Sequence, residues 1–221
     1  MNHKQKWVAV ACLLSSSWVL AGDANSAGWF VRAGAGLSRT AVDLPREDAL
    51  LDPDSTRFDR RDTEWSLDAG YRFANGLGVA AGYRDHGALG YYTPPRVPYC
   101  PPGRICSQQV IPAYEGEIGA TDWRVGVDYR LRWAERWSLT LGLAAARAEA
   151  ELAWAESAHP EEVFSVQTRH WRASPSVSLG YQLQQHWMLD ARAERLADLG
   201  DAFASERFSV SSLTLGATYT F

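Results

Sequence analysis

Apolar and polar residues alternate along most of the chain. From Trp29 to Leu37 every second residue is apolar, and the residues between them are small or charged, apart from Phe30. A period of two is typical of a β-strand with one apolar face. The same alternation predicts eight strands, at residues 29–38, 63–73, 77–84, 122–131, 137–146, 171–182, 187–194 and 212–221.

The connections between these strands are alternately short and long. The short ones are residues 74–76, 132–136 and 184–186, and the long ones are residues 40–62, 85–116, 155–163 and 197–206. Asn75-Gly76 is a typical tight hairpin sequence. A soluble β-sandwich also alternates, but short turns at one end and long loops at the other are typical of an outer-membrane barrel. We therefore predict an all-β fold, an eight-stranded antiparallel up-and-down transmembrane β-barrel.

Aromatic residues on the apolar face are sorted by strand end. The turn end carries Trp29, Tyr71, Phe73, Tyr129, Trp137, Tyr181, Trp187, Tyr219 and Phe221, and the loop end carries Trp65, Tyr83, Trp123 and Trp171. Amphipathic rings favour the membrane–water boundary. Two aromatic belts separated by aliphatic residues therefore indicate the two surfaces of a bilayer.

The first residues are typical of a secretory signal peptide. Lys4 and Lys6 precede a mostly apolar stretch, and Val19-Leu20-Ala21 suits a signal peptidase. We expect residues 1–21 to be the signal peptide and residues 22–221 to be the barrel domain. Cleavage would remove every lysine and leave all 26 acidic residues, so the domain is acidic and nucleic acid is not an expected partner.

Cys100 and Cys106 lie six positions apart in a proline-rich stretch. They are the two cysteines that remain once Cys12 is removed with the signal peptide, and an oxidising compartment favours a disulfide between them. A metal site would need further ligands, and no histidine lies in that stretch.

The opposite parity of the strands carries charges that we expect to face the barrel interior. Seven are positive and six negative: Arg32, Glu64, Asp68, Arg72, Arg84, Asp122, Arg124, Asp128, Arg130, Arg172, Asp190, Arg192 and Glu194. Eight strands leave room only for side chains, so paired ions would plug the lumen. An ion pathway through these charges is the alternative.

Four segments of the chain together resemble the small eight-stranded barrels of the Gram-negative outer membrane, the class of the OmpA transmembrane domain. They are the strand at residues 66–73, the Asn75-Gly76 turn, the return strand at 78–84 and the final segment 213–221. The resemblance implies a location in the cell outer membrane. It also implies that Tyr219 and the terminal Phe221 act as the signal read by the barrel-assembly machinery. Because the chain stops at Phe221, we do not expect the peptidoglycan-binding domain of full-length OmpA-type proteins.

No pattern in the chain predicts catalysis, a cofactor or a metal. The acidic stretch at residues 43–62 lacks the glycine and terminal glutamate of an EF-hand. Some barrels that resemble this one modify lipid A with a His and a Ser near the outer edge. Here His86, His159 and His170 lie near the loop end, and we interpret each as a solvated surface residue without a His–Ser–acid constellation, although Ser157 and Ser165 are nearby in sequence.

The remaining expectations concern the outer rim. Arg147, Glu149, Glu151 and Arg195 have outward parity, so they should lie above the hydrocarbon. There Arg147 and Arg195 can meet phosphates of lipopolysaccharide. Pro175 cannot donate to a ladder and predicts an edge-like irregularity or a bulge.

We therefore expect a monomeric, non-catalytic outer-membrane barrel with a structural and surface-loop role in membrane integrity, adhesion or lipopolysaccharide contact. Its partners would be outer-membrane lipid and lipopolysaccharide, and a host or phage surface ligand. A narrow pore for ions or small solutes and a lipid A-modifying enzyme are the alternatives.

Overall fold

The computed structural model describes residues 27–43, 57–58, 61–95, 110, 112–196 and 207–221. They form nine strands: β1 (Gly28–Asp43), β2 (Arg57–Phe58), β3 (Arg61–Arg72), β4 (Leu77–Thr93), β5 (Tyr114–Arg132), β6 (Trp137–Glu156), β7 (His159–Gln182), β8 (Trp187–Leu196) and β9 (Arg207–Thr220). Within these ranges no helix is long and apolar enough to cross a membrane.

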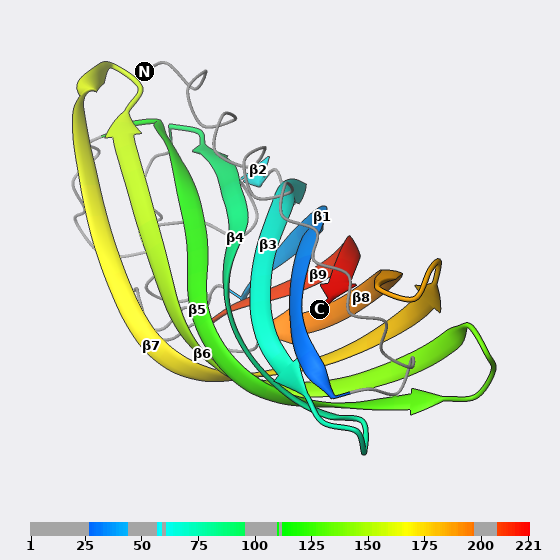
Figure 1. Ribbon diagram of the computed structural model, residues 1–221. Helices are drawn as coiled ribbons and strands as arrows, with labels where there is room; N and C mark the ends of the chain where they lie inside the picture. The colour runs from blue at the N-terminus through cyan, green and yellow to red at the C-terminus, as the bar shows by residue number, and fades with distance from the viewer. Residues whose placement is uncertain (1–26, 44–56, 59–60, 96–109, 111, 197–206) are drawn as a thin grey trace.

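The strands close into a barrel. All pairings are antiparallel, in the order β4-β3-β1-β9-β8-β7-β6-β5, and β5 pairs with β4 to complete the ring (Figure 1). The two-residue strand β2 lies beside β4 at Tyr91 and Tyr92 and is not part of the ring. The prediction of an eight-stranded antiparallel barrel is confirmed.

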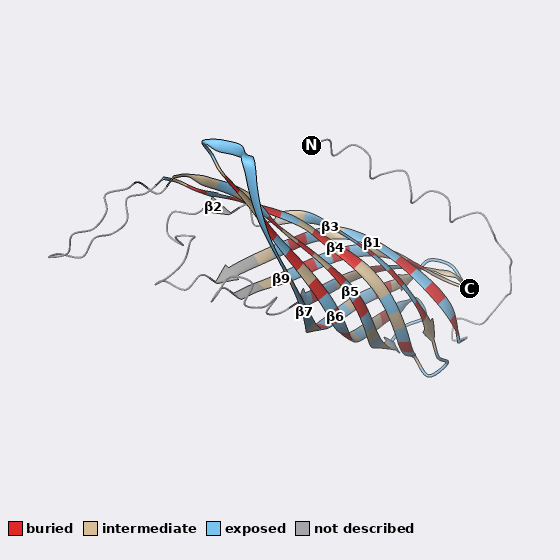
Figure 2. Cartoon of the chain, turned by 90° about the vertical axis from the view of Figure 1, so that its left-hand side faces the viewer, coloured by how far each residue is buried: buried red, intermediate tan, exposed pale blue. Residues whose placement is uncertain are grey.

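Burial follows the predicted alternation (Figure 2). On β1, Trp29 and Leu37 are 65% and 59% exposed, whereas Phe30 and Arg32 are buried. A face of exposed Leu, Val and Trp around buried Arg and Asp is the reverse of a soluble protein, and it suits a barrel with lipid outside and a polar lumen.

The aromatic side chains touch one another in the two predicted belts. At the turn end Trp29 and Tyr71 have ring centroids 5.4 Å apart, and Trp137 and Tyr181 are 4.9 Å apart. At the loop end the Tyr83 ring lies 5.3 Å from Trp65 and 5.0 Å from Trp123.

The strands β4 to β7 continue farthest beyond the ranges that the alternation predicted. β4 runs to Thr93, β5 starts at Tyr114, and β6 and β7 are joined by a turn at residues 157–158. The predicted loops at 85–116 and 155–163 were therefore too long. We call residues 88–93, 114–121, 149–156 and 159–169 the projecting sheet, because they extend these strands beyond the rest of the barrel (Figure 2).

A β-bulge explains why the alternation did not predict the second half of β4. The register with β5 shifts between Asp85 and Ala88, and Gly87 has a positive φ of 80°. One extra residue reverses the facing of the side chains that follow. Leu89 and Tyr91 are consequently buried inside, although they share the odd parity of the outward Tyr83.

The bulge predicted at Pro175 is absent, because Pro175 pairs in register with Leu143 of β6. The edge-like position is confirmed, since the β7–β8 ladder ends one residue away at Ser176. The missing N–H therefore costs no ladder hydrogen bond with β8.

Several predictions fall on residues outside the described ranges. They are the signal peptide at residues 1–21, the Cys100–Cys106 disulfide and most of the 43–62 loop.

Candidate functional site

Six buried ionisable groups form an ion cluster inside the barrel toward the loop end. This loop-end cluster consists of Glu64, Arg84, His86, Asp122, Arg124 and Glu194, whose side chains are at most 4% exposed. Arg84 lies at its centre and is completely buried. Its Nη1 is 3.1 Å from Glu64 Oε1 and 3.0 Å from Glu194 Oε2.

Arg124 joins two carboxylates of the cluster. Its Nε and Nη2 donate to Asp122 at 2.8 and 2.5 Å, a bidentate pair, and its Nη1 contacts Glu194. The Ser174 hydroxyl donates to the same Glu194 oxygen at 2.6 Å. Charge-assisted bonds of this kind are the strong ones in a dry interior.

His86 bridges the two remaining carboxylates. Its Nδ1 lies 2.9 Å from Glu64 Oε2 and its Nε2 lies 2.8 Å from Asp122 Oδ2. Ionised carboxylates only accept hydrogen bonds, so both ring nitrogens must donate and His86 is an imidazolium. The cluster then holds three cations and three carboxylates. The interpretation of His86 as a solvated surface residue is wrong, because the side chain is buried in the lumen.

The bulge holds His86 in this position. The Ser38 hydroxyl donates to the His86 carbonyl at 2.5 Å, and the Gly87 N–H donates to Asp85 Oδ1 at 3.0 Å. The Ala88 N–H donates to Asp62 Oδ2 at 2.5 Å. The alternation carries a signal for the inward direction, because His86 lies two residues after Arg84 on the same parity, but it carries none for the hydrogen bonds, whose groups come from three different strands.

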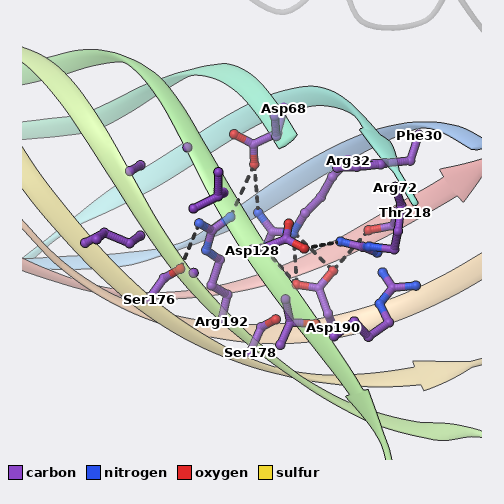
Figure 3. Close-up of a pocket in the computed structure, with 18 of the residues that line it drawn as sticks. Phe30, Arg32, Asp68, Arg72, Asp128, Ser176, Ser178, Asp190, Arg192 and Thr218 are labelled. Atoms are coloured by element: carbon purple, nitrogen blue, oxygen red, sulfur yellow. Dashed lines mark hydrogen bonds and ion pairs between the residues drawn. The ribbon is translucent and has the colours of Figure 1, made fainter. Parts of the chain in front are cut away.

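A second group of charges lies nearer the turn end (Figure 3). Arg32 Nη2 is 2.7 Å from Asp190 Oδ2, and Arg32 Nη1 is 3.3 Å from Asp68 Oδ2. Arg192 lies 3.5 Å from the same Asp68 oxygen and reaches back to the loop-end cluster, 3.2 Å from Glu194. The positive charges of Arg32 and Arg192 are thus equal in number to the negative charges of Asp68 and Asp190.

The last pair before the turns is Arg72 and Asp128, which are 2.6 Å apart. The Arg72 guanidinium also lies 4.9 Å from the centre of the Phe30 ring. Between this pair and the second group is a cavity of about 60 Å³, lined by charged, hydroxyl and small residues.

Eleven of the thirteen charges predicted to face inward are thus in ion pairs. Arg130 and Arg172 are the two that do not pair with another of these thirteen residues. Arg130 lines the cavity, but no carboxylate of the described residues lies within ion-pair distance. Arg172 Nη1 donates to the neighbouring Trp171 carbonyl at 3.3 Å.

Apolar side chains close the lumen beyond the loop-end cluster. They are Leu89, Tyr91, Ile118, Ala120, Ala146, Ala148, Leu152, Leu196 and Val210, all at most 8% exposed, with Trp154 packed against them. The interior is therefore filled by ion pairs in its middle and by an apolar plug at its loop end.

The candidate catalytic residues do not come together. His159 and His170 are exposed on β7 eleven positions apart, and His86 is inside the barrel on β4. Ser157 and Ser165 are exposed on the projecting sheet and its turn. Within the described ranges no group of three or more His, Cys, Asp and Glu could hold a metal ion.

The outward charges lie at the rim. Arg147 pairs in register with Trp123 on one side and Trp171 on the other, and both indoles are more than 60% exposed. Glu149 lies 2.9 Å from Arg169. Arg195 is exposed and pairs with Ser211, which pairs in turn with Arg39.

At the other end, Tyr219 packs against Trp187 and Phe221, with centroid separations of 5.0 and 5.1 Å. The Phe221 N–H donates to the Trp29 carbonyl at 2.9 Å, and the Phe221 side chain is 63% exposed.

Comparison with known proteins agrees with this architecture. No curated protein matches the chain significantly in sequence. Among solved structures, Neisserial surface protein A (NspA) is 15% identical with a TM-score of 0.53, and the alignment covers 89% of this chain and 99% of NspA. Ail, the attachment invasion locus protein of Yersinia pestis, is 19% identical with a TM-score of 0.51, over 88% of this chain and 99% of Ail.

At these identities the two structures support the fold alone. The family is established by sequence, because the model of the outer membrane protein beta-barrel domain matches residues 8–221. The alternation, the aromatic belts and this match all place the protein in the outer membrane. The chain belongs to the outer membrane protein beta-barrel domain family.

Proposed function

We propose that this protein is a non-catalytic outer-membrane barrel that binds a host or phage surface ligand through the free edge of its projecting sheet. One observation carries the proposal. β7 pairs with β6 along its length but with β8 only between Ser176 and Gln182. Residues 159–175 therefore have one edge without a strand partner in the described part of the chain.

The direction of the backbone groups on that edge follows from the ladder. The Gln182 N–H donates to Arg136 on the β6 side, and the Leu183 N–H donates to Trp187 on the β8 side. Alternate residues of a strand point their backbone groups to opposite neighbours. Odd-numbered residues such as Ser165 and Gln167 thus direct their N–H and C=O groups to the open edge. Such an edge is a template for an added strand.

The same hairpin exposes apolar side chains. Val163 and Phe164 are 64% and 54% exposed, and the Phe164 ring stacks on Trp154 at 5.9 Å. Clustered apolar surface outside the membrane supports a binding role. The names of Ail and NspA describe attachment and surface proteins; we extend a surface role to this chain only as part of the proposal.

The test replaces one edge residue in two ways. Gln167→Pro removes an N–H from the open edge and leaves the hydrogen bonds to β6, whereas Gln167→Ala removes only the side chain. We expect a non-adherent Gram-negative strain that expresses the protein to attach to cultured epithelial cells. Gln167→Pro should reduce attachment to the level of the empty strain, and Gln167→Ala should retain it. Equal attachment by both variants, with both barrels folded on a heat-modifiability gel, would contradict strand addition.

The filled lumen supports a plugged barrel over the alternative of a narrow pore. Planar bilayers that contain the purified protein should stay electrically silent. Steady, ion-selective openings would instead support the narrow pore.

We further propose that Arg147 and Arg195 bind lipopolysaccharide phosphates, because both lie on the outer rim and Arg147 is flanked by two exposed indoles. Replacing both with Gln should lower the lipopolysaccharide that copurifies with the barrel; Arg169→Gln, which removes an arginine already paired with Glu149, is the matched control. The monomeric state and the role of Tyr219 and Phe221 in assembly belong to the same proposal.

A further inference from the structure

The charges that line the turn-end cavity do not balance. Three aspartates line it, and each is in an ion pair: Asp68 with Arg32 and Arg192, Asp128 with Arg72, and Asp190 with Arg32. Arg124 also lines it but is bound to Asp122 and Glu194. Arg130 is the remaining cation, and among the described residues it has no carboxylate within ion-pair distance.

One nitrogen of Arg130 is buried without a partner among the described residues. Its Nε is buried and has no hydrogen-bond partner, and the same is true of Arg72 Nε. Arg72 and Arg132 act on Arg130 as like charges, and Asp128 and Asp190 attract it from beyond ion-pair distance. An anion that joins this cation would supply an acceptor for the buried N–H and a carboxylate-like partner at ion-pair distance.

The wall beside Arg130 carries hydroxyl donors. Arg130 pairs in register with Thr140, Thr140 with Ser178, and Ser178 with Arg192. The four side chains share the lumen face, and directly opposed residues have Cβ atoms about 5 Å apart. All four line the cavity, and the Thr140 and Ser178 hydroxyls make no hydrogen bond to the described residues.

Size and access suit a small ligand. The cavity of about 60 Å³ has room for about four or five waters, roughly the bulk of one tetrahedral oxyanion. The Arg72 and Asp128 side chains remain 12% and 21% exposed, whereas those of the loop-end cluster are at most 4% exposed. Solvent therefore reaches the cavity from the turn end.

We propose that the turn-end cavity binds a small tetrahedral oxyanion, inorganic phosphate or sulfate, through the Arg130 guanidinium and the hydroxyls of Thr140 and Ser178. The anion supplies the missing negative charge and accepts hydrogen bonds from donors that have no partner in the protein. Arg192 completes the wall, although its own bonds to Asp68, Glu194 and Ser176 make it a weaker contributor. This site does not depend on the projecting sheet.

The experiment is calorimetric titration of the purified full-length barrel in detergent with inorganic phosphate, at constant ionic strength set by gluconate, an anion too large for the cavity. We expect saturable binding of one phosphate per chain. Arg130→Gln should weaken it by about tenfold or more, as expected for loss of a charge-assisted contact. Arg169→Gln, which changes an arginine on the projecting sheet, should leave it unchanged.

A second readout separates binding from folding. Without phosphate, Arg130→Gln should unfold at the same temperature as the wild type or higher, because it removes an unpaired charge. Phosphate should raise the unfolding temperature of the wild type alone. If Arg130→Gln does not fold, the Thr140→Val/Ser178→Ala variant keeps every charge and should still weaken phosphate binding.

Three results would overturn the proposal. They are the absence of saturable phosphate binding, equal binding by wild type and Arg130→Gln, and displacement of phosphate by millimolar chloride but not by sulfate. The last would identify a halide site. Competition by sulfate and not by chloride is the expected result.

Discussion

The two ends of the lumen are built from the same residue types but differ in charge balance and in water. At the loop end three cations and three carboxylates are bound to one another beneath an apolar plug, and their side chains are at most 4% exposed. At the turn end the arginines outnumber the aspartates, a cavity remains, and Arg72 and Asp128 are partly exposed.

The difference shows that polar residues inside a small barrel do more than fill space. A neutral, dry cluster holds the four strands β3, β4, β5 and β8 together only while every member keeps its partner. A wetter compartment with one unpaired cation tolerates substitution and leaves capacity for a ligand. Substitutions at the two ends should therefore have very different effects.

The largest effect should come from Glu194→Gln in the loop-end cluster. Glu194 contacts Arg84, Arg124 and Arg192, so the substitution leaves buried positive charge without compensation. We expect a loss of about 3–5 kcal/mol in the free energy of unfolding, measured by urea titration of the refolded barrel. The control is Glu161→Gln on the exposed hairpin, which should change stability by less than about 0.5 kcal/mol. Similar values for the two variants would show that the cluster is not dry.

Gly87→Val should have the next largest effect. The positive φ of 80° is strained for a β-branched residue, and a Cβ at this position would lie 2.5 Å from Asp62 Oδ2, which holds the bulge. We expect a loss of about 1–3 kcal/mol in the same urea titration, because the bulge that directs His86 inward is disturbed. Gly90→Val is the matched control, because a Cβ at Gly90 meets nothing within 4 Å. If both substitutions cost the same, the bulge does not hold the cluster.

Asp128→Asn at the turn end should have the smallest effect on stability. It removes the partner of Arg72, as Glu194→Gln removes the partner of its arginines, but at a partly exposed site where water can solvate the charge. We expect a loss of about 1 kcal/mol by urea titration. The same variant should bind phosphate more tightly in calorimetry, since the cavity becomes more positive. Weaker phosphate binding would contradict the account of the turn end.

Much of the barrel could be predicted from local pattern. The alternation of Trp29, Val31 and Leu37 with Arg32 and its neighbours identifies the lipid and lumen faces, because lipid and water impose opposite demands on successive side chains. The sorting of Trp and Tyr by strand end follows from the same physics. The range of β4 could not be predicted in full, since one inserted residue at Gly87 reverses the parity on which the prediction depends. β5, β6 and β7 keep their register beyond the predicted ends, but there the buried inward residues, such as Ile118, Ala148 and Leu152, are apolar, which ends the pattern of a polar inward face.

The candidate site, like the fold, could be predicted from the sequence only in part. The sequence by itself determined which charges face the lumen, that these charges nearly balance, and that the protein is an outer-membrane barrel. Only the tertiary structure decided which charges pair, that His86 joins Glu64 to Asp122, and that Arg130 is left beside a cavity. The physical reason is that parity depends on one strand alone, whereas an ion pair between Arg32 and Asp190 or between Arg84 and Glu194 depends on the register and closure of all eight strands.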